Sequence, residues 1–95
     1  MSTKPSQWIV IWDDGMGMAF PMGWDSDCEG ALCSVIFSSH VAIFPDRQAA
    51  RKAINISTKY AQLRQAQGKP ANDDFLGGAR NNLRIVPVVT TWSSK

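Results

Sequence analysis

Short apolar runs separated by turn residues fill the N-terminal half of the chain, a pattern typical of β-strands. Residues 8–12 (WIVIW) are apolar and β-favouring, and they end at Asp13-Asp14-Gly15, a strong hairpin-turn signal. The returning strand is expected over residues 16–20. Because successive side chains of a strand point to opposite faces, residues 8–12 need cover on both faces, which predicts a central strand.

Two further strands are expected. Residues 21–31 (PMGWDSDCEGA) have the Pro, Gly and Asp content of a loop, and residues 32–37 (LCSVIF) begin a third strand, with residues 41–44 a candidate continuation. Residues 83–91 (LRIVPVVTT) predict the final strand. Pro87 has no N–H to donate to a neighbouring strand, so this strand is expected at an edge of the sheet or with a bulge.

The segment between Asp46 and Gly68 predicts the one long helix. Asp46 is a favourable N-cap, Gly68 is a favourable C-terminal stop, and Pro70 follows. In a helical projection one broad face is apolar, made of Ala49, Ala50, Ala53, Ile54, Ile56, Tyr60, Ala61 and Leu63. The opposite face is polar, made of Arg47, Gln48, Arg51, Lys52, Asn55, Thr58, Lys59 and Gln62.

These elements predict a single small α+β domain over residues 1–95, with a flexible N-terminus at residues 1–6. An antiparallel sheet of three to four strands is packed by the long helix, in the order ββ(β)αβ. Residues 68–82 (GKPANDDFLGGARNN) are expected to form a long, mobile loop that exposes Phe75 and Leu76. One helix covers about 10 Å of a sheet about 15 to 20 Å wide. Either part of a tryptophan-rich face is open as an interface, or the long loop and the Trp92 segment close over it.

Charged residues are sorted along the chain. Residues 1–46 contain six acids and one base, a net charge of −5, whereas residues 47–95 contain nine bases and two acids, a net charge of +7. A compact domain with this distribution can present one acidic and one basic surface, each attracting a partner of opposite charge. The whole-chain charge of +2 is too small for general adhesion to nucleic acid, so such binding would need a local basic patch.

The acidic residues define the favoured surface for a protein partner. Two acids lie at the hairpin turn and three lie in the next loop beside an aromatic residue: Asp13, Asp14, Trp24, Asp25, Asp27 and Glu29. Acids that flank an aromatic side chain can imitate the phosphates of nucleic acid and enter a basic groove. The alternative is turn chemistry, because Asp-Gly favours hairpins and Asp-rich loops are soluble. A calcium loop is not expected, since Ile36 stands where a bidentate Glu would be needed.

The alternative surface is basic and consists of Arg47, Arg51, Lys52 and Lys59 on the helix. These side chains could neutralise about three or four phosphates, which predicts weak and salt-dependent binding of nucleic acid. The face has no interleaved aromatic residues for base stacking, and a single helix excludes a helix-turn-helix. A solvated helix face is the competing interpretation.

No residue set forms a recognisable catalytic or metal site. Cys33 and the only histidine, His40, are a candidate nucleophile pair, but the sequence supplies no third group to orient them. With Cys28 they offer three zinc ligands at unsuitable spacing. A disulfide between Cys28 and Cys33 is geometrically possible, but reduced thiols are favoured in the expected compartment. We therefore expect a non-enzymatic protein with no metal and no cofactor.

Residues 44–54 (FPDRQAARKAI) and 83–88 (LRIVPV) resemble segments of small proteins of phages and prophages. The resemblance covers about a fifth of the chain, and its motifs encode a helix start and a strand. Small phage proteins often block a host defence system by binding it, and anti-CRISPR proteins are such a class. That class has no shared motif, so the resemblance implies a kind of partner and assigns no functional residue.

The sequence therefore favours a phage-type inhibitor that binds a host protein or protein–RNA complex, such as CRISPR-Cas, through the acidic and aromatic surface. A nucleic-acid-binding accessory protein that uses the basic helix face is the alternative. Homodimerisation through the sheet face or the Pro87 edge is compatible with both. The sequence contains no apolar run long enough to span a membrane and no signal-peptide pattern, which favours the cytosol. The resemblance to phage proteins implies that this is the bacterial host cytosol.

Overall fold

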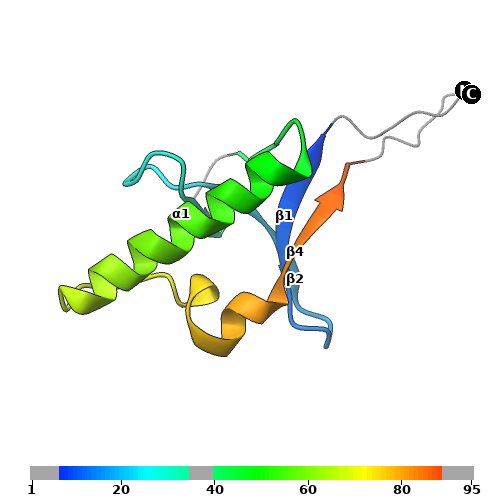
Figure 1. The fold of residues 1–95 in the computed structure, drawn as a ribbon. Helices are drawn as coiled ribbons and strands as arrows, with labels where there is room; N and C mark the ends of the chain where they lie inside the picture. The colour runs from blue at the N-terminus through cyan, green and yellow to red at the C-terminus, as the bar shows by residue number, and fades with distance from the viewer. Residues whose placement is uncertain (1–6, 35–39, 89–95) are drawn as a thin grey trace, which may run out of the picture.

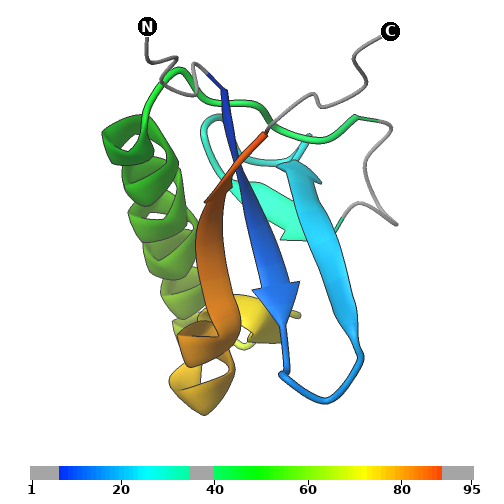
Figure 2. The same ribbon diagram turned by 90° about the vertical axis from the view of Figure 1, so that its right-hand side faces the viewer.

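The structure, a computed structural model, describes residues 7–34 and 40–88 and consists of one antiparallel sheet and one long helix (Figure 1). The strands are β1 (Trp8–Asp13), β2 (Ala19–Trp24), β3 (Leu32–Ser34) and β4 (Leu83–Pro87). Their order across the sheet is β3-β2-β1-β4. The predicted α+β class is confirmed, as are the central position of β1 and the edge position of β4. Figure 2 shows β4, β1 and β2 side by side.

The second strand differs from the prediction. Residues 16–18 belong to the hairpin turn, and β2 continues through residues 21–24, which were expected to be loop. β2 pairs with β1 up to Pro21 and with β3 from Met22 onward. Pro21 therefore lies where one pairing ends and the other begins, and a proline is tolerated there. The expected strand residues 35–37 and 89–91 and the expected flexible residues 1–6 lie outside the described part of the chain.

Residues 41–44 join β1 and β2 where these strands lose their mutual register. The N–H of Trp8 donates to the carbonyl of Phe44 at 2.9 Å, and the N–H of Phe44 donates to the carbonyl of Trp8 at 2.8 Å. The N–H of Ala42 donates to the carbonyl of Met22 at 3.1 Å. The candidate continuation of the third strand therefore pairs with β1 and β2 through isolated bridges.

The helix α1 (Arg47–Ala66) begins and ends as the sequence predicts. The Asp46 side chain accepts a hydrogen bond from the N–H of Ala49 at 2.7 Å, which satisfies a donor of the first turn. Gly68 has a φ of 71°, and the next residue, Lys69, donates its N–H to the carbonyl of Arg64 at 2.9 Å. This is a Schellman termination, which favours glycine at that position. Within residues 7–34 and 40–88, no helix is both long and apolar enough to cross a bilayer.

The core lies between α1 and the tryptophan-bearing face of the sheet. Its buried members are Val10, Met22, Leu32, Ala42, Phe44, Ala50, Ala53, Ile54, Ala61 and Phe75. Trp8 and Trp12 share a face of β1 with Val10 and pack against this cluster, so of the two alternatives the structure supports a covered face at these two tryptophans. The Trp92 segment lies outside the described part of the chain. Ile9 and Ile11, on the opposite face, are partly buried.

One position on the helix was assigned to the wrong environment, and one buried position was assigned to neither face. Leu63 is 55% exposed, although it was expected on the apolar face, and Ser57 is 2% exposed. Leu63 lies roughly 130° around the helix from the centre of the buried side chains. It is therefore at the edge of the broad apolar face that the helical projection predicted. Ser57 is buried because both polar functions of its hydroxyl are used: it accepts from the N–H of Leu32 and donates to the carbonyl of Ala53.

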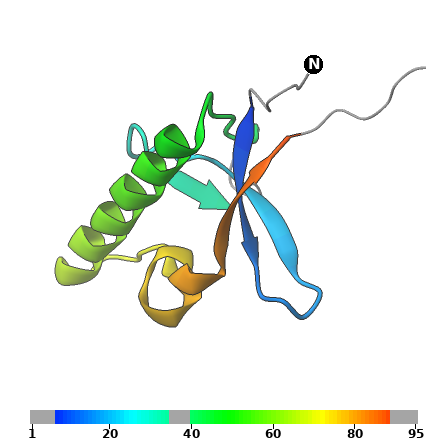
Figure 3. The same cartoon turned by 45° about the vertical axis from the view of Figure 1, so that its right-hand side comes forward.

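The segment 68–82, expected as a long loop, contains short helices, and the expected exposure of Phe75 and Leu76 is wrong. It contains two 3-10 helices, η2 (Asp73–Phe75) and η3 (Gly77–Asn82), which lie below the helix and the lower end of the sheet (Figure 3). Phe75 is 1% exposed and belongs to the core, and Leu76 is partly buried against it. The indole N–H of Trp12 donates to the carbonyl of Ala79 at 3.0 Å. A polar segment is thus held by two apolar side chains, by one hydrogen bond to β1 and by side-chain hydrogen bonds to α1.

Candidate functional site

The predicted acidic surface is divided between the two ends of β2. Asp13 and Asp14 lie at the hairpin turn that precedes the strand, whereas Trp24 ends it and the other three acids follow. Since a strand rises about 3.3 Å per residue, these ends are roughly 16 Å apart. The structure therefore brings Trp24, Asp25 and the two acids of the next loop together, and separates them from the hairpin pair.

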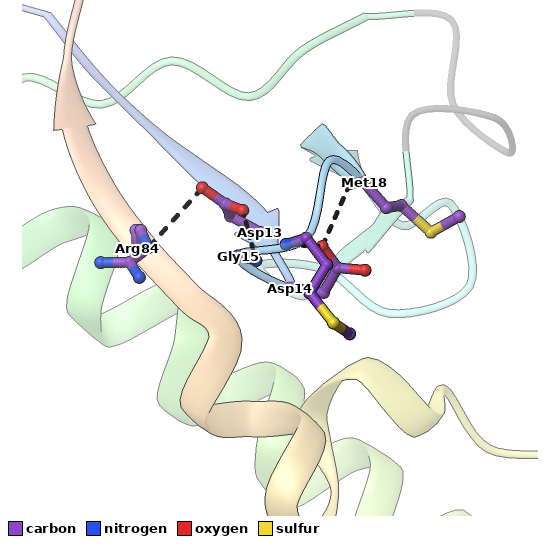
Figure 4. A network of polar contacts seen from close by, with 6 residues as sticks. Asp13, Asp14, Gly15, Met18 and Arg84 are labelled. Atoms are coloured by element: carbon purple, nitrogen blue, oxygen red, sulfur yellow. Dashed lines mark hydrogen bonds and ion pairs between the residues drawn. The ribbon is translucent and has the colours of Figure 1, made fainter.

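At the hairpin turn the acids serve the backbone (Figure 4). One carboxylate oxygen of Asp13 accepts from the N–H of Gly15 at 2.8 Å. One oxygen of Asp14 accepts from the N–H groups of Met16 at 2.7 Å and Met18 at 3.1 Å. These contacts are the turn chemistry that was the alternative interpretation, and they give Asp13 and Asp14 a structural role.

The second acidic loop is closed on itself and rests on α1. The N–H of Asp25 donates to the carbonyl of Ala31 at 2.9 Å, and a carboxylate oxygen of Asp25 accepts from the N–H of Asp27 at 2.7 Å. Gly30 has a φ of 84°, and a Cβ there would lie 3.3 Å from the Cδ1 atom of Ile56. The loop therefore needs glycine for both conformation and close approach to the helix.

Across a groove of about 560 Å³, this loop meets a second pair of acids. Asp25 and Asp27 line the groove together with Asp73 and Asp74 of η2. The other lining residues are Ser26, Cys33, Ser34, Tyr60, Arg64, Pro70, Ala71 and Asn72. We call this hollow the acidic groove. Sequence reasoning missed Asp73 and Asp74, although a signal was present: they are the only acids among residues 47–95.

Burial, reinforced by neighbouring carboxylates, raises the pKa of two residues that line the acidic groove. Burial raises the pKa of the Asp74 carboxyl, and the neighbouring Asp73 raises this pKa further. Burial also raises the pKa of the Cys33 thiol, and the charges of Asp25 and Asp27 raise it further. Both shifts favour the uncharged form of the group, chiefly through burial and to a smaller degree through the neighbouring carboxylates.

Among the described residues, Arg64 is the one base that lines the acidic groove, and the contacts of its side chain there are to neutral groups. Its Nε donates to the carbonyl of Pro70 at 2.5 Å, and its Nη1 donates to the hydroxyl of Tyr60 at 3.3 Å. The guanidinium carbon lies 5.7 Å from the centre of the Tyr60 ring. Within the described part of the chain no ion pair joins Arg64 to an acid of the groove. The groove therefore combines four carboxylates with one guanidinium.

A second hollow adjoins the same loop. Trp24, Asp25, Glu29 and Gly30 line a space of about 450 Å³, which we call the Trp24 hollow. Trp24 is 42% exposed, and its ring packs edge-on against Phe44 with the ring centres 5.2 Å apart. An exposed indole beside carboxylates offers a cation both a π face and a counter-charge. Asp25 lines both hollows, so the two adjoin at this residue.

The predicted basic face is also divided. Arg47 and Arg51 line a hollow between α1 and β4, whereas Lys52 lines a different hollow together with Trp24 and Phe44. Lys59 is exposed and lines neither of these hollows. The structure therefore does not gather the four bases around one hollow.

The Cys33 thiol lacks the features of an activated nucleophile. Its sulfur lies 3.7 Å from the carbonyl oxygen of Trp24, and its raised pKa lowers the fraction of reactive thiolate. His40 is exposed. Cys28 and Cys33 are both free thiols. Among the residues that the structure describes, no three His, Cys, Asp or Glu side chains converge to hold a metal ion.

Comparisons with protein-family models, with curated proteins and with solved structures find no match to this chain. The resemblance to small phage proteins therefore remains a prediction. The functional argument rests on the geometry and charge of the acidic groove and the Trp24 hollow.

Proposed function

We propose that this protein is a binding protein that docks the acidic groove and the Trp24 hollow onto a basic surface of a protein partner. One observation carries the proposal. Four carboxylates from two distant segments, at Asp25, Asp27, Asp73 and Asp74, line one groove, and no ion pair neutralises them within the described residues.

Like charges gathered in one groove repel each other, so the free protein holds this arrangement against electrostatic repulsion. Arginine or lysine side chains of a partner would remove that repulsion when they enter the groove. Arginine fits best, because its planar guanidinium binds a carboxylate through two parallel hydrogen bonds and also stacks on aromatic rings. Asp25 and the exposed Trp24 ring lie side by side for such contacts.

The proposed partner is a nucleic-acid-binding protein or protein–RNA complex of a bacterial host. Surfaces rich in arginine and lysine are the electrostatic footprint of nucleic-acid binding. A protein that covers such a surface with carboxylates competes with the nucleic acid for the same binding site. It would thereby inhibit the partner without catalysing a reaction. A phage-type inhibitor of a defence complex such as CRISPR-Cas, acting in the host cytosol, is the specific form of this proposal.

The first test measures how tightly the acidic groove binds a basic peptide. The probe is a fluorescein-labelled peptide of nine arginines, and binding is followed by fluorescence anisotropy. The test variant is Asp73→Asn with Asp74→Asn, and the matched control is Asp13→Asn with Asp14→Asn, which removes the same charge from the hairpin turn. Because a hydrogen bond to a charged group contributes about 1.5 to 3 kcal/mol, we expect the test variant to bind at least about tenfold more weakly.

The control variant should bind within about twofold of the natural protein, and circular dichroism should show both variants folded. An equal loss in both variants would mean that the peptide responds to net charge alone, and the proposal would then be wrong. A pull-down from nuclease-treated bacterial lysate, with the Asp73 and Asp74 variant as the reference, then identifies the partner. A protein captured by the natural chain and not by this variant supports the proposal.

A further inference from the structure

A second hollow, between α1 and β4, gathers three arginines. Arg47 and Arg51 of α1 and Arg80 of η3 line a space of about 270 Å³. The other lining residues are Ile54, Asn55, Leu83 and Ile85. We call this space the arginine hollow. No carboxylate of the residues that the structure describes lines it.

Two of the three arginines are held in place by neighbours. The Nε of Arg80 donates to the hydroxyl of Thr58 at 2.9 Å, and its Nη2 donates to the side-chain oxygen of Asn55 at 3.2 Å. The guanidinium carbon of Arg47 lies 5.6 Å from the centre of the Trp8 ring. These contacts position the two guanidinium groups and leave their charges unneutralised.

None of the three takes part in an ion pair within residues 7–34 and 40–88. The ion pair found there joins Arg84 to Asp13, with 3.9 Å between the nitrogen and the oxygen. Three guanidinium groups around one small space repel each other unless an anion lies between them. Arg80 donates two of its five N–H groups to α1, so others are available to a ligand.

The chemistry of the arginine hollow selects the ligand. Guanidinium groups bind phosphate oxygens through paired hydrogen bonds. Ile54, Leu83 and Ile85 also line the hollow, and their apolar side chains suit the base or sugar attached to a phosphate. We propose that the arginine hollow binds the phosphate of a nucleotide, either free or within a single strand of nucleic acid. This site shares no lining residue with the acidic groove, so it stands independently of the proposed function.

The test uses a matched pair of variants on α1. Arg51→Ala removes one charge from the arginine hollow, and Lys59→Ala removes the same charge from an exposed position that does not line it. Arg51 is exposed and makes no hydrogen bond or ion pair within the described residues, so its removal should leave the fold intact, as circular dichroism can verify. The probes are adenosine monophosphate, followed by calorimetry, and a fluorescein-labelled ten-nucleotide thymidine strand, followed by anisotropy.

We expect Arg51→Ala to weaken binding about tenfold or more and Lys59→Ala to change it less than twofold. Binding of both probes with that pattern identifies a free nucleotide as a sufficient ligand, whereas the same pattern for the strand alone identifies the nucleic-acid backbone as the source of the phosphate. Absence of binding by both probes, or equal weakening by both variants, would overturn the proposal.

Discussion

Ser57 ties the helix to the sheet at the place where the acidic loop ends. Its hydroxyl oxygen accepts a hydrogen bond of 2.7 Å from the N–H of Leu32, the first residue of β3, and donates one of 2.6 Å to the carbonyl of Ala53. Both Ser57 and Leu32 are buried, at 2% and 1% exposure. Ser57→Ala removes the acceptor and leaves the Leu32 N–H buried without a partner.

The expected loss of stability follows from that orphaned donor. A buried N–H without a partner costs about 1 to 3 kcal/mol, whereas the Ala53 carbonyl retains its place in the helix. A small domain has an unfolding free energy of about 5 to 15 kcal/mol, so the loss is a substantial part of the total. For a chain of this size it corresponds to a fall in the melting temperature of about 4 to 24 °C.

Urea unfolding followed by tryptophan fluorescence measures this loss, because Trp8 and Trp12 pack against the core. Ser26→Ala is the matched control, since Ser26 is exposed, and its effect should stay within about 0.5 kcal/mol. If Ser57→Ala behaved like this control, the hydroxyl would not be a necessary link between α1 and β3, and the reasoning would be refuted.

Three further variants test other parts of the structure. Phe75→Ala should lower the unfolding free energy by about 3 to 5 kcal/mol in urea titrations, whereas Leu63→Ala, at an exposed position, should change it by less than about 0.5 kcal/mol; similar losses would contradict the assigned burial. Gly30→Ala should cost about 1 to 2 kcal/mol by thermal melting because its φ is positive, and Gly78→Ala, which meets no atom within 4 Å, should melt nearly unchanged. Asp74→Asn should raise the urea midpoint near pH 7. The raised pKa means that the folded state disfavours the charged carboxyl, so the natural protein loses stability as the pH rises above 3.8, the ordinary value. Near pH 3 the Asp74 carboxyl is neutral in the folded and in the unfolded state, so the difference in urea midpoint between the natural protein and Asp74→Asn should vanish.

The elements predicted correctly depend on local signals. Asp46 and Gly68 fix the ends of α1 through bonds to residues within one turn, so their neighbours in sequence contain the information. The later start of β2 and the burial of Phe75 depend on distant partners. Pro21 is compatible with a strand because of where the registers with β1 and β3 meet, and Phe75 is buried because it packs in the core beneath α1. Neither arrangement can be predicted from the residues that are adjacent in sequence.

The candidate site was predicted in part for the same reason. Trp24, Asp25 and the following acids form one loop, and proximity in sequence was enough to group them. Asp73 and Asp74 reach the same groove only through the packing of η2 on the core, and Arg80 reaches the arginine hollow only through η3. The hairpin acids show the opposite error, because charge alone does not reveal that their oxygens bind the backbone of the turn.

Asp74 connects stability to the proposed function. Folding gains nothing from a partly buried carboxyl whose pKa is raised by burial and by Asp73, since the charged form is disfavoured in the free protein. A basic partner in the acidic groove would favour that charged form, so binding and deprotonation should reinforce each other, and affinity should rise with pH through this titration. Asp74→Asn should therefore gain stability and lose affinity at the same time. A residue with a purely structural role would lose stability when replaced, so opposite signs in the two measurements distinguish a carboxyl kept for binding from one kept for the fold.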